Sequence, residues 1–150
     1  MPEAAGTKLF IVTLRTDFIN LNQASNTTLS LIKHLHHASL VASDLAASRA
    51  FYEGVLELPI NPTRPKLPYD GIWYDIGDSM IHLLVVPNPD AGAVRPEHGG
   101  VDRHTALNVS DFDELIARLE KAGIPYTRSK SGRKALFCRD PDGNALEFMG

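Results

Sequence analysis

Apolar and polar positions along the chain predict a strand, a helix and further strands, in that order. A strand-like apolar run over residues 35–42 stops at Ser43-Asp44 and gives way to a helical pattern over residues 45–56. Asp44 has the residue type and position of a helix N-cap. A proline-rich loop follows, and apolar runs joined by a Gly-Asp turn then predict strands at 72–76 and 80–86.

The second half of the chain repeats this order. An offset of 67 positions (104 − 37) places His104 under His37 and matches His, Leu, Ser and Asp in the two copies. The second copy enters a helix capped by Asp111, with Glu114 three residues on, and the helix ends at Gly123. Strands are then expected at 125–127, 135–139 and 145–149. The repeated order predicts an α+β domain of two similar modules.

A length of 150 residues allows one domain of ordinary size. Residues 1–33 are interpreted as an N-terminal extension, and residues 34–150 as the domain. Within it we place module one at 35–87, a linker rich in proline and glycine at 88–101, and module two at 102–150.

Composition narrows the function classes. A hydrophobic content of 43% with 22% charged residues is typical of a globular protein, and no apolar run approaches the ~20 residues of a membrane helix. The net charge of −3 and the scattered Lys and Arg residues argue against nucleic acid as a partner. The single cysteine, Cys138, excludes an internal disulfide and is interpreted as a packing residue, which favours a cytoplasmic location.

Metal-binding side chains occupy equivalent places in the two modules. Strand alternation puts His37 on one face of its strand, and the repeat makes His104 its counterpart. The last apolar strand of each module carries one more such residue, His82 or Glu147, at spacings of 45 (82 − 37) and 43 (147 − 104). The sequence therefore predicts one metal site with four ligands. The remaining histidines, His34, His36 and His98, are interpreted as non-ligands.

Three imidazoles and one carboxylate suit a divalent ion such as Ni, Zn, Co, Mn or Fe(II), whereas Mg and Ca prefer oxygen ligands. Four protein ligands leave an octahedral ion two positions for water or for two adjacent oxygens of a substrate. A redox role and a redox-silent role are both open at this stage.

The motif His-x-x-Leu-x-x-Ser-Asp-Leu at His37, with Arg139-Asp-Pro-Asp-Gly-Asn-Ala-Leu-Glu near the end, resembles the vicinal oxygen chelate superfamily. This superfamily contains glyoxalase I, methylmalonyl-CoA epimerase, extradiol dioxygenases, fosfomycin resistance enzymes and bleomycin resistance proteins. The resemblance implies two βαβββ modules that form a cupped mixed sheet. It also implies metal ligands at the positions of His37, His82, His104 and Glu147, and a homodimer that acts on a small molecule.

A fourth potential ligand at His82 favours a lyase or isomerase of the glyoxalase I type. In that mechanism a proton is abstracted next to a carbonyl, the metal stabilises the enediolate, and Glu147 is the candidate base. Bacterial glyoxalase I usually has Glu at the position of His82, and the epimerase has Gln, so the substrate stays open. The alternatives are an Fe(II) extradiol-type dioxygenase and a non-catalytic small-molecule binding or resistance protein.

Two further residues are candidates for substrate binding. Trp73 lies in a strand expected to line the cup, although an aromatic residue in a strand is more often part of the core. Arg133 lies in a loop from which it can reach an acidic substrate. Other cations in or beside loops, Arg64, Lys66 and Lys134, are interpreted as solvated.

Overall fold

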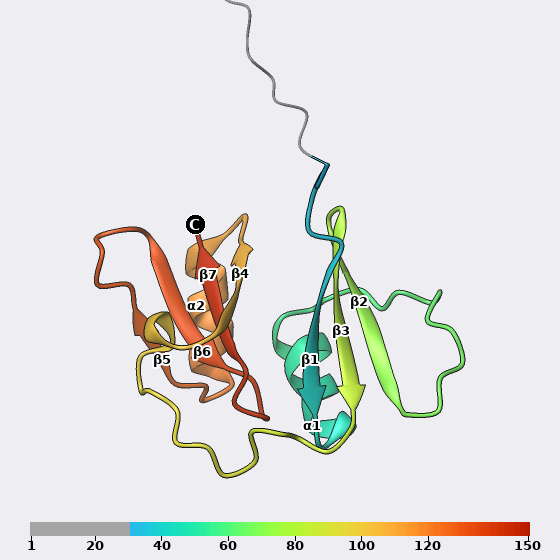
Figure 1. Cartoon of the computed structure of the whole chain (residues 1–150). Coiled ribbons are helices and arrows are strands. Elements are labelled where there is room, and N and C mark those ends of the chain that lie inside the picture. The colour runs from blue at the N-terminus through green and yellow to red at the C-terminus, as the bar shows by residue number, and fades with distance from the viewer. Residues whose placement is uncertain (1–30) are drawn as a thin grey trace, which may run out of the picture. The chain divides into compact units, whose positions relative to one another are not determined.

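The first module folds around a three-stranded sheet in the order β1-β3-β2 (Figure 1). The computed structural model describes residues 31–150, and residues 34–150 form one compact unit. Most of the proposed extension, residues 1–30, lies outside the described residues. Strand β3 pairs in parallel with β1 and antiparallel with β2. The elements of this module are β1 (His37–Ala42), α1 (Leu45–Arg49), η1 (Ala50–Val55), β2 (Gly71–Ile76) and β3 (Ser79–Val85).

The second module has a four-stranded sheet in the order β4-β7-β6-β5. Strand β7 is parallel to β4 and antiparallel to β6, and β5 completes the sheet beyond β6. The linker between the modules contains one short 3-10 turn, η2 (Gly99–Val101). The elements of the module are β4 (His104–Asn108), α2 (Phe112–Lys121), β5 (Tyr126–Arg128), β6 (Ala135–Arg139) and β7 (Ala145–Met149). Both the α+β class and the twofold repeat are thus confirmed.

The structure differs locally from the expected elements in two places. The helix predicted over residues 45–56 begins at its cap Asp44, but its second half is a π-helix, in which the Leu56 amide donates to the carbonyl of Phe51 at 3.0 Å. The first module also lacks a full counterpart of β5. Only an isolated bridge between Ile60 and Tyr74 stands there. Pro59 and Pro62 flank this bridge and lack the N–H that a longer ladder needs.

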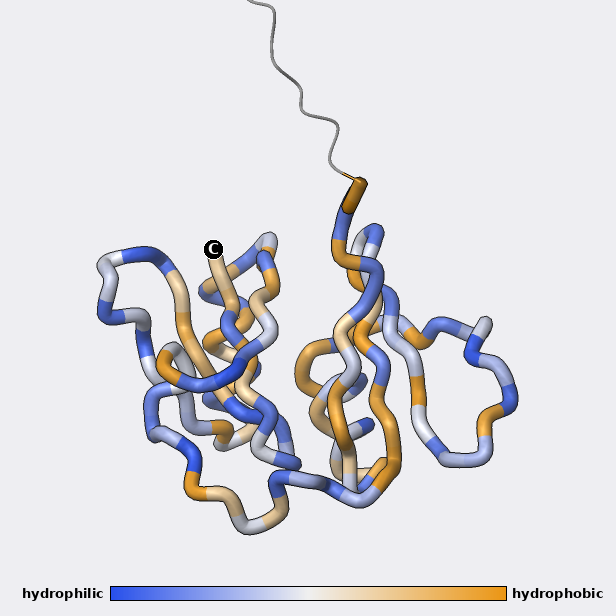
Figure 2. The backbone as a smooth tube through the Cα atoms, viewed as in Figure 1, coloured by the Kyte–Doolittle hydropathy of each residue, from blue (hydrophilic) through white to orange (hydrophobic). Residues whose placement is uncertain are grey.

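The hydrophobic core takes one face of each sheet. In β3 the side chains of Ile81 and Leu83 belong to the core, and in β7 those of Leu146 and Phe148 do so. One buried cluster includes residues of both modules, and Figure 2 shows hydrophobic colouring concentrated on the strands and helices. Because side chains alternate along a strand, His82 and Glu147 must lie on the faces opposite this core.

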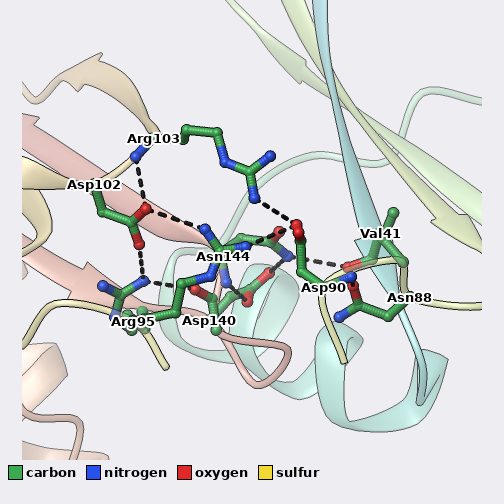
Figure 3. Close-up of polar contacts among 10 residues, drawn as sticks. Val41, Asn88, Asp90, Arg95, Asp102, Arg103, Asp140 and Asn144 are labelled. Carbon is green, nitrogen blue, oxygen red and sulfur yellow. Dashed lines mark hydrogen bonds and ion pairs between the residues drawn. The ribbon is translucent and has the colours of Figure 1, made fainter. Parts of the chain in front are cut away.

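The turn at residues 140–144 joins the two modules. The Tyr52 hydroxyl donates to Asp140 Oδ2 at 2.8 Å. The Asn144 side-chain amide donates to the carbonyl of Val41 at 3.0 Å, as Figure 3 shows. The backbone amide of Ser43 donates to Asp142 Oδ1 at 2.7 Å. Gly143 at the tip has a φ of +81°, which favours glycine. The turn is therefore a polar joint between the halves.

No helix of residues 31–150 has the length and apolar character required to cross a bilayer.

Helix α2 provides a test of the predicted caps. Asp111 Oδ1 accepts hydrogen bonds from the backbone amides of Asp113 and Glu114 at 3.2 and 3.0 Å. The Glu114 carboxylate pairs with Arg118, one turn further along the same helix, at 2.8 Å. We expect Asp111→Ala to lower the free energy of unfolding by about 1 kcal/mol, because two amides lose their acceptor. Urea unfolding measures this loss, with Asp113→Ala as the control, and an equal loss in both variants would contradict the capping role.

Candidate metal centre

The two predicted ligands of module one, His37 and His82, lie in a stack of aromatic rings that crosses the sheet. Their centroids are 4.0 Å apart with an angle of 14° between the planes, and Trp73 stacks on the other face of His82 at 3.9 Å and 5°. The stack follows from the register, which places Trp73 of β2 opposite His82 of β3. On the β1 side, the register partner of His82 is Ser39, which lies two positions along β1 from His37 and on the same face. Module one therefore brings His37, His82 and Trp73 together on one sheet face.

His82 has the chemical state that a metal ligand requires. It is 7% exposed, and burial, reinforced by the nearby His37, lowers the pKa of His82 to about 4. Its imidazole is therefore neutral at pH 7, with a lone pair available. Its buried Nε2 has no hydrogen-bond partner. A buried nitrogen without a partner is unfavourable by itself, and a bound cation would satisfy it.

The ring planes of this pair do not converge. Lone pairs of imidazole lie in the plane of the ring, so the nearly parallel rings of His37 and His82 direct theirs along parallel planes. The Nδ1 atoms of His36 and His37 share a hydrogen bond of 2.9 Å, which leaves Nε2 of His37 for another partner. Binding of one ion by both residues thus requires one ring to rotate.

The two candidate ligands of module two already face each other. His104 Nε2 is 3.2 Å from Glu147 Oε2. Two ligands at ~2.1 Å from one ion lie ~3.0 Å apart in octahedral and ~3.4 Å apart in tetrahedral geometry, so this spacing fits both. The His104 Nδ1–H donates to the carbonyl of Asp102 at 2.9 Å, because a carbonyl can only accept. Nε2 of a neutral His104 therefore directs its lone pair at a carboxylate oxygen, an arrangement that a proton or a metal ion must bridge.

Glu147 has one oxygen engaged and one free. Its side chain is 6% exposed, and the buried Oε1 has no hydrogen-bond partner. The closest cation to Oε1 is Nη2 of Arg133, at 3.9 Å, which is beyond hydrogen-bond distance. The donor set of His104 and Glu147, with unsatisfied buried atoms in both modules, fits a borderline divalent ion.

A network of ion pairs surrounds the Asp102 carboxylate (Figure 3). The Asp102 carboxylate, 8% exposed, pairs with Arg95 at 3.0 Å and with Arg139 at 2.9 Å, and accepts the backbone amide of Arg103 at 2.8 Å. Arg95 also pairs with Asp90 at 2.8 Å. Because this network fixes Asp102, it also fixes the carbonyl that receives the proton of His104 Nδ1. The pattern of the sequence did not indicate Asp102, since one of its partners, Arg139, lies on the separate strand β6.

The linker contributes a second feature that the sequence did not indicate. Gly99 and Gly100 pack on Phe137, and a Cβ built at Gly99 would lie 3.0 Å from that side chain. His98 lies edge-on to Phe137 with ring centroids 4.9 Å apart, and its Nδ1 shares a hydrogen bond of 2.8 Å with the Thr127 hydroxyl. Phe137 is the register partner of Glu147 on β7, so the linker covers part of the sheet face that carries Glu147.

The four predicted ligands form two pairs within one chain. Among residues 31–150, no group of three or more His, Cys, Asp and Glu side chains is placed to hold a metal ion. A cavity of about 320 Å³ lies beside His104, lined by residues of β1, the linker and the 143–145 turn, but Glu147 does not line it. The cavity is therefore distinct from the space between His104 and Glu147. Cys138 is buried in the core, where burial raises the pKa of its thiol to about 12, as expected of a packing residue.

Comparison with known proteins identifies the family. Residues 34–148 match the model of the Glyoxalase/Bleomycin resistance protein/Dioxygenase superfamily. The chain belongs to this superfamily. The uncharacterised protein YaeR of Escherichia coli is 32% identical over 128 residues, which cover 78% of this chain and 95% of YaeR.

Two solved structures of the superfamily extend the comparison. A putative glyoxalase family protein from Bacillus anthracis has a TM-score of 0.65 and 26% identity, covering 79% of this chain and 95% of its own. The lactoylglutathione lyase from Agrobacterium tumefaciens has a TM-score of 0.55 and 27% identity, covering 78% and 92% of the two chains. The superfamily and the α+β fold expected from the sequence are both confirmed.

Proposed function

We propose that this protein is a divalent-metal-dependent lyase or isomerase of the glyoxalase I type, which abstracts a proton next to a carbonyl group of a small molecule. The observation that carries the proposal is the His104–Glu147 pair, in which an imidazole nitrogen and a carboxylate oxygen face each other at 3.2 Å. Similarity to a lactoylglutathione lyase supports the reaction class. The proposed ligands are His37, His82, His104 and Glu147, for Ni, Zn, Co, Mn or Fe(II).

The two oxygens of Glu147 suggest two separate tasks. Oε2 faces His104 and is the proposed ligand atom, whereas Oε1 is buried and has no hydrogen-bond partner. A buried carboxylate oxygen without a hydrogen-bond partner is a suitable general base, so Oε1 is the proposed acceptor of the substrate proton. A bound divalent ion would act as a Lewis acid that lowers the pKa of the adjacent C–H bond. Trp73, beside His82, and Arg133, beside Glu147, are the proposed substrate-binding residues.

The separation of the ligands into two pairs supports a site shared between two copies of the chain. Module one supplies the pair His37 and His82, and module two supplies His104 and Glu147. A twofold dimer in which module one of each copy meets module two of the other would form two equivalent sites. The free edges of the sheets, β1 and β4, carry one ligand each, His37 and His104. We therefore propose a homodimer as the functional form.

Metal content tests the proposal directly. Protein purified without an affinity tag and reconstituted with each candidate ion is expected to hold about one ion per chain by elemental analysis. Glu147→Ala should lose the ion, because it removes the carboxylate ligand. Glu147→Gln retains one oxygen and should hold part of the metal while losing the activity. The loaded protein would be assayed with a hemithioacetal first.

The exposed Glu97→Ala serves as the surface control and should keep the wild-type metal content. An absence of metal from the wild-type protein after reconstitution would refute the proposed enzyme. A non-catalytic small-molecule binding protein would then be the better interpretation.

A further inference from the structure

Arg133 is a cation beside Glu147, and among the described residues no carboxylate lies within hydrogen-bond distance of its guanidinium. Its side chain is 67% exposed, and its Nε donates to the Ser131 hydroxyl at 3.1 Å. Nη2 lies 3.9 Å from Glu147 Oε1, too far for a hydrogen bond. The neighbouring Lys134 is engaged elsewhere, with its Nζ 5.1 Å from the centre of the Phe112 ring. The Arg133 guanidinium therefore retains donors directed toward the site.

The charge balance of this site favours an anion. Arg139 lies on the same sheet face, but Asp102 neutralises it at 2.9 Å. The imidazoles of His37, His82 and His104 would add no charge when they hold the ion, so the side-chain charges that remain are those of Glu147 and Arg133. When a divalent ion binds, its two positive charges exceed the single negative charge of Glu147, and Arg133 adds a further positive charge. A site with this excess of positive charge attracts a negatively charged ligand.

We propose that Arg133 binds a carboxylate of the substrate, so that the substrate class is a small acid with one carboxylate beyond the two oxygens that would reach the metal. The proposal rests on the proposed function and specifies its substrate. A planar guanidinium can donate two parallel hydrogen bonds to a carboxylate, which fixes the orientation of the ligand. Arg133 is suited to this role because Glu147 becomes occupied by the ion and no longer needs a counter-charge.

Two simple acids test this assignment by calorimetric titration of the metal-loaded protein. DL-malate and DL-lactate carry the same 2-hydroxy acid group, but malate has one more carboxylate. We expect malate to bind about tenfold more tightly than lactate to the wild-type protein, the effect of one charge-assisted contact. In Arg133→Gln the two dissociation constants should become nearly equal, through weaker binding of malate. The control Lys134→Gln should keep the tenfold difference.

The affinity for the metal itself provides an independent measurement. Removal of a positive charge near a cation should leave the metal affinity of Arg133→Gln equal to or higher than that of the wild type. A lower metal affinity in Arg133→Gln would overturn the proposal, and so would an unchanged ratio of the malate and lactate dissociation constants. Either result would mean that Arg133 only supports Glu147. Equal binding of malate and lactate to the wild type would overturn it while the proposed enzyme stands. A wild type that binds no metal would overturn both.

Discussion

Replacement of Asp140 with alanine is expected to lower the free energy of unfolding by about 3–5 kcal/mol. Asp140 is 5% exposed and accepts hydrogen bonds from the Tyr52 hydroxyl at 2.8 Å and from the side-chain amide of Asn144 at 2.7 Å. The backbone amides of Asp142 and Asn144 donate to its other oxygen at 3.0 and 2.8 Å. The variant would leave these donors without their acceptor, including a hydroxyl of the fully buried Tyr52, and would loosen the joint between the modules.

Urea unfolding would measure this loss. Asp78→Ala changes the same residue type in an exposed hairpin turn and should alter the free energy of unfolding by no more than about 0.5 kcal/mol. Asp140→Asn retains one acceptor oxygen but adds a donor among existing donors, so its loss should be intermediate. A loss of less than 1 kcal/mol in Asp140→Ala would show that the carboxylate is not needed at the joint.

Mixing two inactive variants is expected to restore metal binding, because the proposed site takes one pair of ligands from each copy. His37→Ala removes a ligand of module one, and Glu147→Ala removes a ligand of module two, so each homodimer has only defective sites. When equal amounts exchange subunits at random, half of the dimers contain one copy of each variant, and one of the two sites in those dimers is intact. Metal content and activity should therefore recover to about a quarter of the wild-type values.

The matched control mixes His104→Ala with Glu147→Ala, two changes in the same module. Every site in that mixture contains a defective module two, so no recovery is expected. Native mass spectrometry would verify that subunits exchange in both mixtures. Exchange without recovery in the His37→Ala and Glu147→Ala mixture would contradict the shared site and favour four ligands that meet within one chain.

Local sequence was sufficient for most of the secondary structure. The bounds of β6 and β7 match the expected strands at 135–139 and 145–149. Asp44 and Asp111 cap their helices through backbone amides two and three residues away, an interaction contained within a few neighbouring residues. The π-helical turn of η1 and the reduction of one strand to a single bridge at Ile60 were not predicted. The bridge stays short because Pro59 and Pro62 lack the N–H that a longer ladder needs.

The duplication placed each candidate ligand on the correct strand, because residues in equivalent repeats occupy equivalent places in the fold. It could not indicate the relation among the ligands. His104 and Glu147 face each other, whereas His37 and His82 stack with parallel planes beside Trp73. Side-chain rotation and cross-strand stacking determine these orientations, and neither leaves a pattern along the chain.

The amino-acid sequence by itself determined the two modules, their strands and helix caps, the face of each candidate ligand and the superfamily, because these depend on residues close together or on a repeated pattern. Only the tertiary structure decided that the ligands form two separate pairs within one chain. It also decided that Asp102 fixes the ring of His104, and that Arg133 lies beside the free oxygen of Glu147. The contact of Asp102 with His104 is local, but Arg139 of β6 holds the Asp102 carboxylate, and the other two features depend on contacts between different strands and loops. Their geometry is set by the packing of sheets, linker and loops.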